Sequence, residues 1–187
     1  MYLLFKLSVD FLFSFLFLII LSPFLIIISF FIILESPGNP FFFHKRIGKD
    51  LNTFYLIKFR TMFVDSDKKK YWTEINDKRI TKFGKLLRKY SIDELPQLIN
   101  ILFFKMSLIG PRPDTPFQIK NYTKEEWLNR HKILPGITGL SQTTGRSDLT
   151  NKQRKRLDLF YVNNYSFLLD LKILFKTSFE VIKGNSF

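Results

Sequence analysis

Residues 91–113 read SIDELPQLINILFFKMSLIGPRP, and the rest of the chain is best interpreted around this stretch. Ser91 and Glu94 stand at the spacing of a capping box, which predicts that Asp93 and Glu94 lie in the first turn of a helix. Backbone N–H groups and the helix dipole favour carboxylates at such a position. The pair therefore has two interpretations: it only caps a helix, or it forms a reaction centre.

Two arginines flank this acidic pair. Arg88 lies upstream of it, and Arg112 stands between Pro111 and Pro113, which restrict the local backbone. A guanidinium presents a planar fork that matches phosphate oxygens. A carboxylate nucleophile beside fixed cations is what a phosphate-bearing substrate would need, so the arginines favour the reaction-centre interpretation.

The spacing of the polar and proline residues in this stretch is recognisable as two halves of one signature. The residues are Ser91, Asp93, Glu94, Pro96, Gln97 and Asn100, followed by Met106, Ser107, Gly110, Pro111, Arg112 and Pro113. In these positions the chain resembles the bacterial sugar transferases, specifically the small monotopic polyprenol-phosphate phosphoglycosyl transferases, whose signature reads S-x-D-E-x-P-Q-x-x-N and then M-S-x-x-G-P-R-P. A match of this length and spacing is specific.

The resemblance implies a reaction that would initiate glycoconjugate synthesis. Asp93 would attack the β-phosphorus of a UDP-sugar and expel UMP, and polyprenol (undecaprenyl) phosphate would then take the phosphosugar from the carboxylate. Glu94, with Asp93, would bind Mg²⁺, because the charges of a diphosphate repel a carboxylate nucleophile and oxygen-only ligation suits this ion. The residues implied for substrate binding are Lys58, Arg60, Arg79, Arg88, Pro111, Arg112, Pro113, Gln142 and Arg146.

The composition points to a negatively charged partner and argues against some metal sites. The 187 residues include 29 Lys and Arg against 16 Asp and Glu, a net charge of +13. Only Lys6, Asp10 and Glu35 are charged in residues 1–35, so the basic excess belongs to the remainder. The absence of cysteine excludes disulfides and Cys-type zinc sites, and two histidines argue against a His-rich metal centre.

The N-terminal region predicts a membrane helix. The uncharged run 11–34 would measure about 36 Å as a helix, which exceeds the ~30 Å hydrocarbon core of a bilayer. Ser22-Pro23 stands at its midpoint and predicts a bend, because proline removes a hydrogen-bond donor and clashes with the carbonyl of Ile19. A kinked spanning helix and a helix that turns back to the same face both remain open on these grounds. The resemblance implies the second, a re-entrant helix hinged at Ser22-Pro23 with both ends in the cytoplasm.

Residues 41–47 and 53–62 are rich in strand-forming residues and are joined by a short polar segment, which predicts a β-hairpin. Its second strand ends in K-F-R-T-M at 58–62. Taken alone, Lys58 and Arg60 would form a solvated basic face of the strand. The resemblance instead places them at the border of the active site.

Helical periodicity and capping signals predict several further helices. One begins within 77–84 and ends near Tyr90, one runs on from the acidic pair to about Phe104, and others cover about 124–132, 150–163 and 167–182. A capping box formed by Thr123 and Glu126 marks one of these helix starts. Related sequences usually have glycine where Phe104 stands, so a left-handed turn there would strain the backbone. Residues 65–79 predict a surface loop, and the three glycines of 134–146 predict close approach of the backbone to a ligand.

We therefore expect a mostly helical α+β protein: a re-entrant membrane helix over 1–35, then a catalytic domain over 36–187 with a small hairpin and amphipathic interfacial helices. The resemblance implies the bacterial inner membrane, with the catalytic domain on the cytoplasmic face. Expected partners are a UDP-sugar, polyprenol phosphate and membrane lipids, with a homodimer and downstream glycosyltransferases as further candidates and no nucleic acid.

Two other functions are compatible with parts of the sequence. A membrane-anchored basic scaffold would bind anionic lipid or nucleic acid, but it leaves the acidic pair and the loop with Gly145 and Arg146 without a role. Direct glycosyl transfer would use the same substrates and release UDP, so the nucleotide product distinguishes it from phosphosugar transfer.

Overall fold

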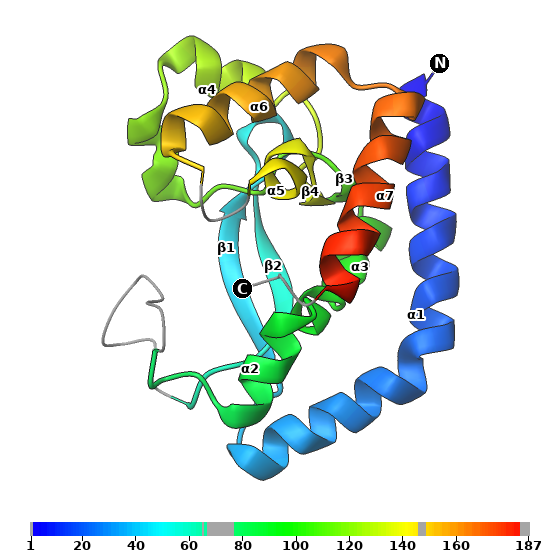
Figure 1. The fold of residues 1–187 in the computed structure, drawn as a ribbon, viewed down its shortest axis with the longest axis vertical. Helices are drawn as coiled ribbons and strands as arrows, with labels where there is room; N and C mark the ends of the chain where they lie inside the picture. The colour runs from blue at the N-terminus through cyan, green and yellow to red at the C-terminus, as the bar shows by residue number, and fades with distance from the viewer. Residues whose placement is uncertain (1, 65, 67–76, 146–148, 184–187) are drawn as a thin grey trace.

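The computed structural model describes residues 2–64, 66, 77–145 and 149–183, and in this part the chain is a mostly helical α+β protein with small sheets (Figure 1). The helices are α1 (Tyr2–Glu35), α2 (Lys82–Lys89), α3 (Gln97–Leu102), α4 (Lys124–Arg130), α5 (Leu140–Thr144), α6 (Asn151–Asn164) and α7 (Phe167–Ile182). The short 3₁₀ segments are η1 (Lys49–Leu51), η3 (Ile92–Glu94) and η4 (Pro116–Asn121). The strands are β1 (Phe41–Ile47), β2 (Thr53–Phe59), β3 (Ser107–Ile109) and β4 (Gly136–Thr138).

Helix α1 bends near its middle, as the sequence predicts, and its two arms run in different directions (Figure 1). Pro23 lies inside the helix and cannot donate a hydrogen bond to the carbonyl of Ile19. The hydroxyl of Ser22 donates to that carbonyl instead, at 2.8 Å. The Ser-Pro pair therefore bends the helix and still satisfies the acceptor that the proline leaves open.

The N-terminal arm of α1 is tied to the rest of the chain by buried polar contacts. Lys6 Nζ lies 2.5 Å from Asp170 Oδ2 of α7, and Asp170 Oδ1 accepts a hydrogen bond from the Tyr161 hydroxyl at 2.6 Å. Asp10 accepts a hydrogen bond from Ser107 of β3 at 2.5 Å. Charges buried in this way need partners, so these contacts fix where the arm lies along α7.

The C-terminal arm of α1 is tied to the same domain at a different place. Ile28 and Ile32 pack in a buried cluster with Phe59 of β2 and Leu87 of α2. The carboxylate of Glu35 accepts hydrogen bonds from the backbone N–H groups of residues 82 and 83, at 2.7 and 3.0 Å, and so caps α2. Both arms of one long helix are thus held by one folded unit.

Most of the side chains on α1 are apolar and exposed. Among the described residues it is the helix that is long and apolar enough to cross a membrane, and little of its most apolar stretch is buried by the rest of the chain. The aromatic rings of Phe13 and Phe17 stack on one another at 4.1 Å on its surface. A helix of this kind indicates that the protein associates with a membrane.

The predicted hairpin is confirmed, and the signature asparagine explains how it is placed. Strands β1 and β2 pair antiparallel with Phe41 opposite Phe59, so the second strand ends three residues earlier than predicted. Asn100 of α3 accepts a hydrogen bond from Ile57 N at 3.0 Å and donates one to Tyr55 O at 2.8 Å. The Asn100 side chain therefore fixes α3 against β2. It brings the strand that carries Lys58 close to the turn that carries the acidic pair.

A second, parallel sheet was not predicted from the sequence. Strands β3 and β4 pair with Ser107 opposite Gly136, and Gly110 N donates to Thr138 O at 2.9 Å. A Cβ on Gly136 would lie 2.0 Å from Gly110 N, and one on Gly139 would lie 2.2 Å from Gly110 O. Gly136 and Gly139 thus permit close backbone packing, and the approach of this loop's backbone to a ligand stays a prediction.

The remaining helix predictions are largely confirmed. Capping boxes begin α4 at Thr123 and α6 at Thr150, and the bounds of α6 and α7 lie within one residue of those expected. Phe104 adopts a left-handed conformation with a φ of 52°, and its ring stacks on Phe11 of α1 at 5.7 Å. Residues 65 and 67–76, most of the predicted surface loop, lie outside the described part.

Candidate active site

The acidic pair lies in a 3₁₀ turn, so the predicted capping box at Ser91 is wrong. Ser91 has a left-handed backbone with a φ of 54°, and its side chain caps nothing. Glu94 N donates to the backbone carbonyl of Ser91 at 3.1 Å, which closes the turn. Helix α3 begins only at Gln97. The left-handed residue turns the chain sharply after α2 and directs both carboxylates toward β2 and the Pro-Arg-Pro segment.

Two cations from distant parts of the chain meet the pair. Lys58 Nζ of β2 lies 2.5 Å from Glu94 Oε1 and 3.9 Å from Asp93 Oδ2. Arg112 Nη2 lies 2.7 Å from Glu94 Oε1, and its Nη1 lies 3.5 Å from Oε2. The two negative charges are therefore matched by two positive charges, and Glu94 holds both cations beside Asp93.

The surroundings separate the two carboxyl groups in acidity. Burial raises the pKa of Asp93 to about 6, against the lowering effect of Lys58 and with the charge of Glu94 adding to the rise. Burial also opposes ionisation of Glu94, but the adjacent Arg112 and Lys58 hold the pKa of Glu94 well below its usual range. Near pH 7 both groups are ionised, and Asp93 is the more basic of the two.

Of the other predicted residues, Arg88 belongs to this site. Its Nε donates to Thr61 Oγ1 at 2.8 Å, and its charge contributes to lowering the pKa of Asp93. Sequence reasoning missed Thr61, although it stands inside the K-F-R-T-M motif; its hydroxyl fixes the direction of the Arg88 side chain.

Two predicted arginines are directed elsewhere. The guanidinium of Arg60 donates to the carbonyl of Ser36, where the chain leaves α1. Arg79 forms an ion pair with Asp77 at 2.7 Å. Both residues thus brace the segments between α1 and α2.

The remaining predicted residues that the structure describes follow β3 or β4 in the chain. Pro111 O accepts a hydrogen bond from Gly136 N at 2.9 Å, and Pro113 O accepts one from Arg46 at 3.0 Å. Gln142 of α5 donates to Ile137 O at 2.8 Å. Arg146 lies outside the described residues.

The donor set near Asp93 fits a magnesium ion that also binds substrate. No group of three or more His, Cys, Asp or Glu side chains gathers in the described part of the chain. Mg²⁺ needs only one or two protein carboxylates when phosphate oxygens and water complete its shell. Asp93 and Glu94 supply such a pair, and Oε2 of Glu94 makes only the longer of the two contacts with Arg112.

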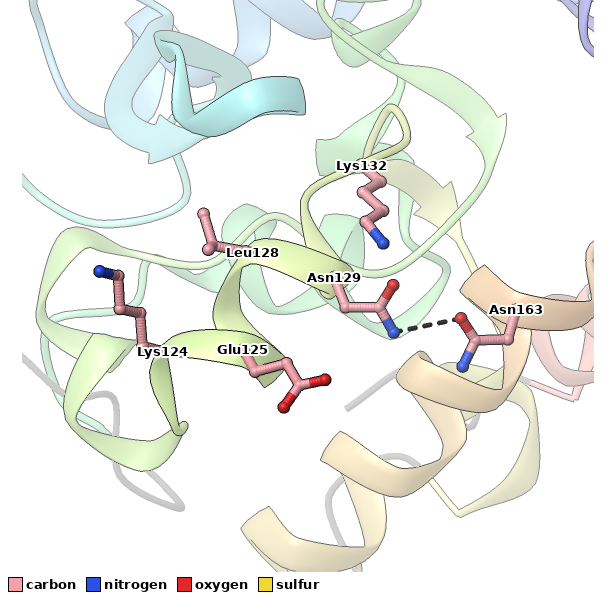
Figure 2. A pocket seen from close by; sticks show the side chains of 6 residues that line it. All are labelled: Lys124, Glu125, Leu128, Asn129, Lys132 and Asn163. Carbon is pink, nitrogen blue, oxygen red and sulfur yellow. Dashed lines mark hydrogen bonds between the residues drawn. The ribbon is translucent and has the colours of Figure 1, made fainter.

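Surface shape alone would point to a different part of the molecule. A hollow of about 670 Å³ lies beside α4 and α6 and is lined by Lys124, Glu125, Leu128, Asn129, Lys132 and Asn163 (Figure 2). Asn129 and Asn163 are joined across it by a hydrogen bond of 3.1 Å. It presents a single carboxylate and contains none of the predicted site residues, so the acidic pair remains the candidate for the active site.

Comparison with known proteins decides the family. The model of the family described as "Bacterial sugar transferase" matches residues 1–184, almost the whole chain. The chain belongs to the bacterial sugar transferase family. The resemblance inferred from the signature of residues 91–113 is thereby confirmed.

Members of the bacterial sugar transferase family that resemble this chain differ in length. The chain is 41% identical over 184 residues to a UDP-glucose:undecaprenyl-phosphate glucose-1-phosphate transferase of Klebsiella pneumoniae, and the match covers 94% of this chain but 40% of that relative. It is 41% identical to the uncharacterized sugar transferase EpsL of Bacillus subtilis, with 89% and 82% covered. It is 38% identical to the exopolysaccharide production protein ExoY of Sinorhizobium fredii, with 92% and 83% covered.

The electrostatics of the acidic pair yield a prediction that can be tested without an activity assay. Infrared difference spectra between the wild type and Asp93→Asn should isolate the protonated carboxyl of Asp93, with a titration midpoint near its pKa of about 6. Lys58→Met should move the midpoint upward, because a cation that favours the ionised form is lost, and Glu94→Gln should move it downward, because a repelling charge is lost. A wild-type midpoint at the ordinary value of 3.8 would contradict the arrangement.

Proposed function

We propose that this protein transfers a phosphosugar from a UDP-sugar to polyprenol phosphate through a covalent intermediate on Asp93. The observation that carries the proposal is the buried carboxyl group of Asp93, which has a raised pKa, lies 3.9 Å from Lys58 and stands next to a glutamate that binds both Lys58 and Arg112. The proposal is also supported by relatives in the family whose names specify undecaprenyl-phosphate and glucose 1-phosphate transfer. Such a transfer initiates polysaccharide or other glycoconjugate synthesis.

In the first step the Asp93 carboxylate attacks the β-phosphorus of the UDP-sugar. A new bond forms between the carboxylate oxygen and phosphorus, and the bond from phosphorus to the bridging oxygen breaks, so that UMP leaves with the electron pair. The product is an acyl phosphate that carries the sugar. A raised pKa makes Asp93 a better nucleophile than an ordinary aspartate while leaving it ionised near pH 7.

In the second step a phosphate oxygen of polyprenol phosphate attacks the same phosphorus. The acyl phosphate bond breaks, Asp93 returns as a carboxylate, and polyprenol diphosphate sugar is released. Lys58 and Arg112 would hold phosphoryl oxygens in both steps, because both cations already lie against the pair. Arg88 lies on the α2 side of Asp93 and suits the lipid-borne phosphate.

We assign Mg²⁺ to Glu94, with Asp93 beside it. When bound, the ion would neutralise diphosphate charge that otherwise repels the carboxylate. Arg60, Arg79, Pro111, Pro113, Gln142 and Arg146 remain proposed substrate-binding residues on the strength of the resemblance alone.

The proposed site of action is the cytoplasmic face of the inner membrane, with α1 as a re-entrant helix. The support is the attachment of both arms: Lys6 and Asp10 of one arm and Glu35 of the other bind one folded unit. A helix whose two arms are held by a single unit on one membrane face need not cross the bilayer. This arrangement would bring the phosphate of a membrane-bound polyprenol to Asp93.

The covalent step predicts the order of product release. UDP-sugar alone should release UMP in an amount close to that of enzyme, and intact mass after rapid quench should show the phosphosugar adduct. Asp93→Asn should lower UMP release to background, because the amide keeps the shape and loses the nucleophile. If neither UMP nor adduct forms until polyprenol phosphate is added, Asp93 is not the nucleophile. Release of UDP in place of UMP would establish direct glycosyl transfer.

The metal assignment predicts a change in magnesium dependence. Glu94→Gln should lose most activity and require a higher Mg²⁺ concentration for half-maximal UMP release, because a neutral amide is a weaker ligand than a carboxylate. Titrating wild type and variant from metal-free protein with Mg²⁺ measures the shift. An unchanged midpoint would place the metal on other residues.

The re-entrant topology predicts that both ends of α1 share one face of the membrane. Single cysteines introduced at residues 2 and 40 of this cysteine-free chain should both resist an impermeant thiol reagent in intact cells and both react in inverted vesicles. Labelling of only the N-terminal cysteine in intact cells would establish a spanning helix instead.

A further inference from the structure

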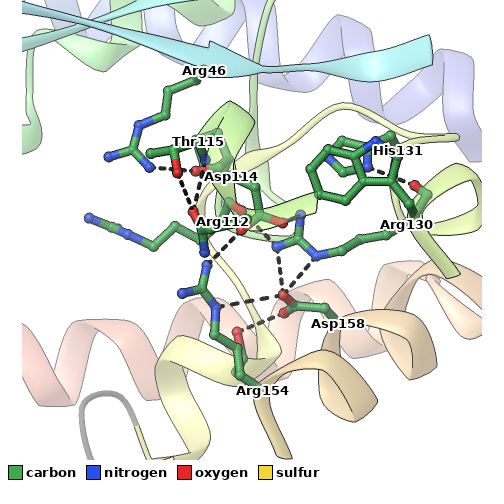
Figure 3. A network of polar contacts seen from close by, with 12 residues as sticks. Arg46, Arg112, Asp114, Thr115, Arg130, His131, Arg154 and Asp158 are labelled. Atoms are coloured by element: carbon green, nitrogen blue, oxygen red, sulfur yellow. Dashed lines mark hydrogen bonds and ion pairs between the residues drawn. The ribbon is translucent and has the colours of Figure 1, made fainter. Parts of the chain in front are cut away.

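Three arginines from three different elements hold the segment that carries Arg112 (Figure 3). Arg130 Nη2 of α4 donates to the carbonyl of Arg112 itself, at 2.7 Å. Arg46 Nη1 of β1 donates to the carbonyl of Pro113 at 3.0 Å. Arg154 Nη2 of α6 lies 3.3 Å from Asp114 Oδ1. Three consecutive residues, 112 to 114, are each bound by a guanidinium.

Arg130 is the centre of this arrangement and is almost completely buried. Its Nη1 lies 2.7 Å from Asp114 Oδ2, and its Nη2 lies 2.7 Å from Asp158 Oδ2. The side chains of these three residues are 0 to 1% exposed. A single guanidinium thus spans two buried carboxylates and still donates to the backbone of Arg112, which the point charge of a lysine could not do.

Asp158 connects the same guanidinium to the second loop of the proposed site. Its Oδ1 accepts a hydrogen bond from Ser141 Oγ of α5 at 2.7 Å, while its Oδ2 binds Arg130. The Pro-Arg-Pro segment and α5, which carries Gln142, are therefore both attached to the buried carboxylate of Asp158. The first is attached through Arg130 and the second through Ser141. The distance between the two loops depends on this connection as well as on the pairing of β3 with β4.

Stability is a weak explanation for this buried cluster. Desolvating ions costs about as much free energy as their attraction returns, so apolar side chains of similar volume could pack α4 against α6 equally well. Apolar side chains could not donate a hydrogen bond to the Arg112 carbonyl. What the cluster adds is a fixed position for the backbone of that residue.

A second ion pair joins the same two helices without touching the site. Glu126 of α4 and Lys155 of α6 lie 2.7 Å apart near the surface. Glu126 also completes the capping box of α4, which glutamine can preserve. The outer pair is therefore a matched control for the inner one.

We propose that Arg130, fixed by Asp114 and Asp158 and assisted by Arg46, is a positioning residue that holds the guanidinium of Arg112 in register with Glu94 and the diphosphate of the nucleotide substrate. The inference rests on the proposed function of Arg112. Arg130 itself touches no substrate; it acts through the carbonyl of Arg112.

The test is a double-mutant cycle on the first half-reaction, with UMP release from UDP-sugar measured in detergent or nanodiscs. Arg130→Lys keeps the buried charge and loses the fork, and should lower kcat/KM for UDP-sugar roughly 10- to 100-fold, the scale of a small misplacement of a binding group. In an Arg112→Lys background the same change should cost less than threefold, because the group that it positions is already lost. Glu126→Gln should leave kcat/KM unchanged in both backgrounds.

Thermal unfolding of every variant separates positioning from loss of fold. If the Arg130→Lys variant does not fold, Arg46→Met takes its place in the cycle. Arg46 is only half-buried, and its replacement leaves Asp114 and Asp158 paired with Arg130. The proposal would be overturned if Arg130→Lys, or Arg46→Met, lowered kcat/KM by the same factor in the wild-type and the Arg112→Lys backgrounds. A wild type that releases no UMP would instead refute the proposed function, and a neutral Arg112→Lys would refute both the role of Arg112 and its positioning.

Discussion

Asp93 and Glu94 are adjacent charges taken largely out of water, and such a pair persists only if cations are brought to it. Lys58 arrives from β2 and Arg112 from the segment after β3, which are far apart in the sequence. Burial disfavours the ionised form of both carboxyl groups, but Glu94 binds Lys58 and Arg112 directly, whereas Asp93 lies 3.9 Å from Lys58. The result is an ionised but basic Asp93 beside a strongly acidic neighbour. Much of the fold can be understood as the means of keeping these four side chains together.

Three residues of the signature each fix part of this arrangement. Asn100 fixes α3 to β2 and so sets the approach of Lys58 to the acidic turn. Gly110 allows β3 and β4 to pair closely and thereby places the Pro-Arg-Pro segment. Ser107 has a different role, since its hydroxyl donates a hydrogen bond to Asp10 of α1. The helix is therefore connected to the strand that leads directly to Arg112.

Backbone strain borders the acidic segment at both ends. Ser91 enters the 3₁₀ turn in a left-handed conformation, and Phe104 leaves α3 in another. Conformations of this kind cost free energy in non-glycine residues and are maintained by their surroundings. At Phe104 the surroundings include Phe11, on which its ring stacks, and Phe11 stacks in turn on Phe15. The position of α3 relative to α1 thus depends in part on packing between aromatic side chains.

The sequence alone determined the elements whose signals are local: the bend at Ser22-Pro23, the hairpin, and the helices that begin at Thr123 and Thr150. It also determined the family, because the signature combines many fixed spacings. Tertiary structure decided what depends on distant partners. The Ser91 turn, the pairing of β3 with β4 and the buried contacts of Arg130 have no local periodicity, since each is fixed by groups remote in the sequence. The same holds for the raised pKa of Asp93, which arises from burial and from a lysine 35 residues earlier in the chain.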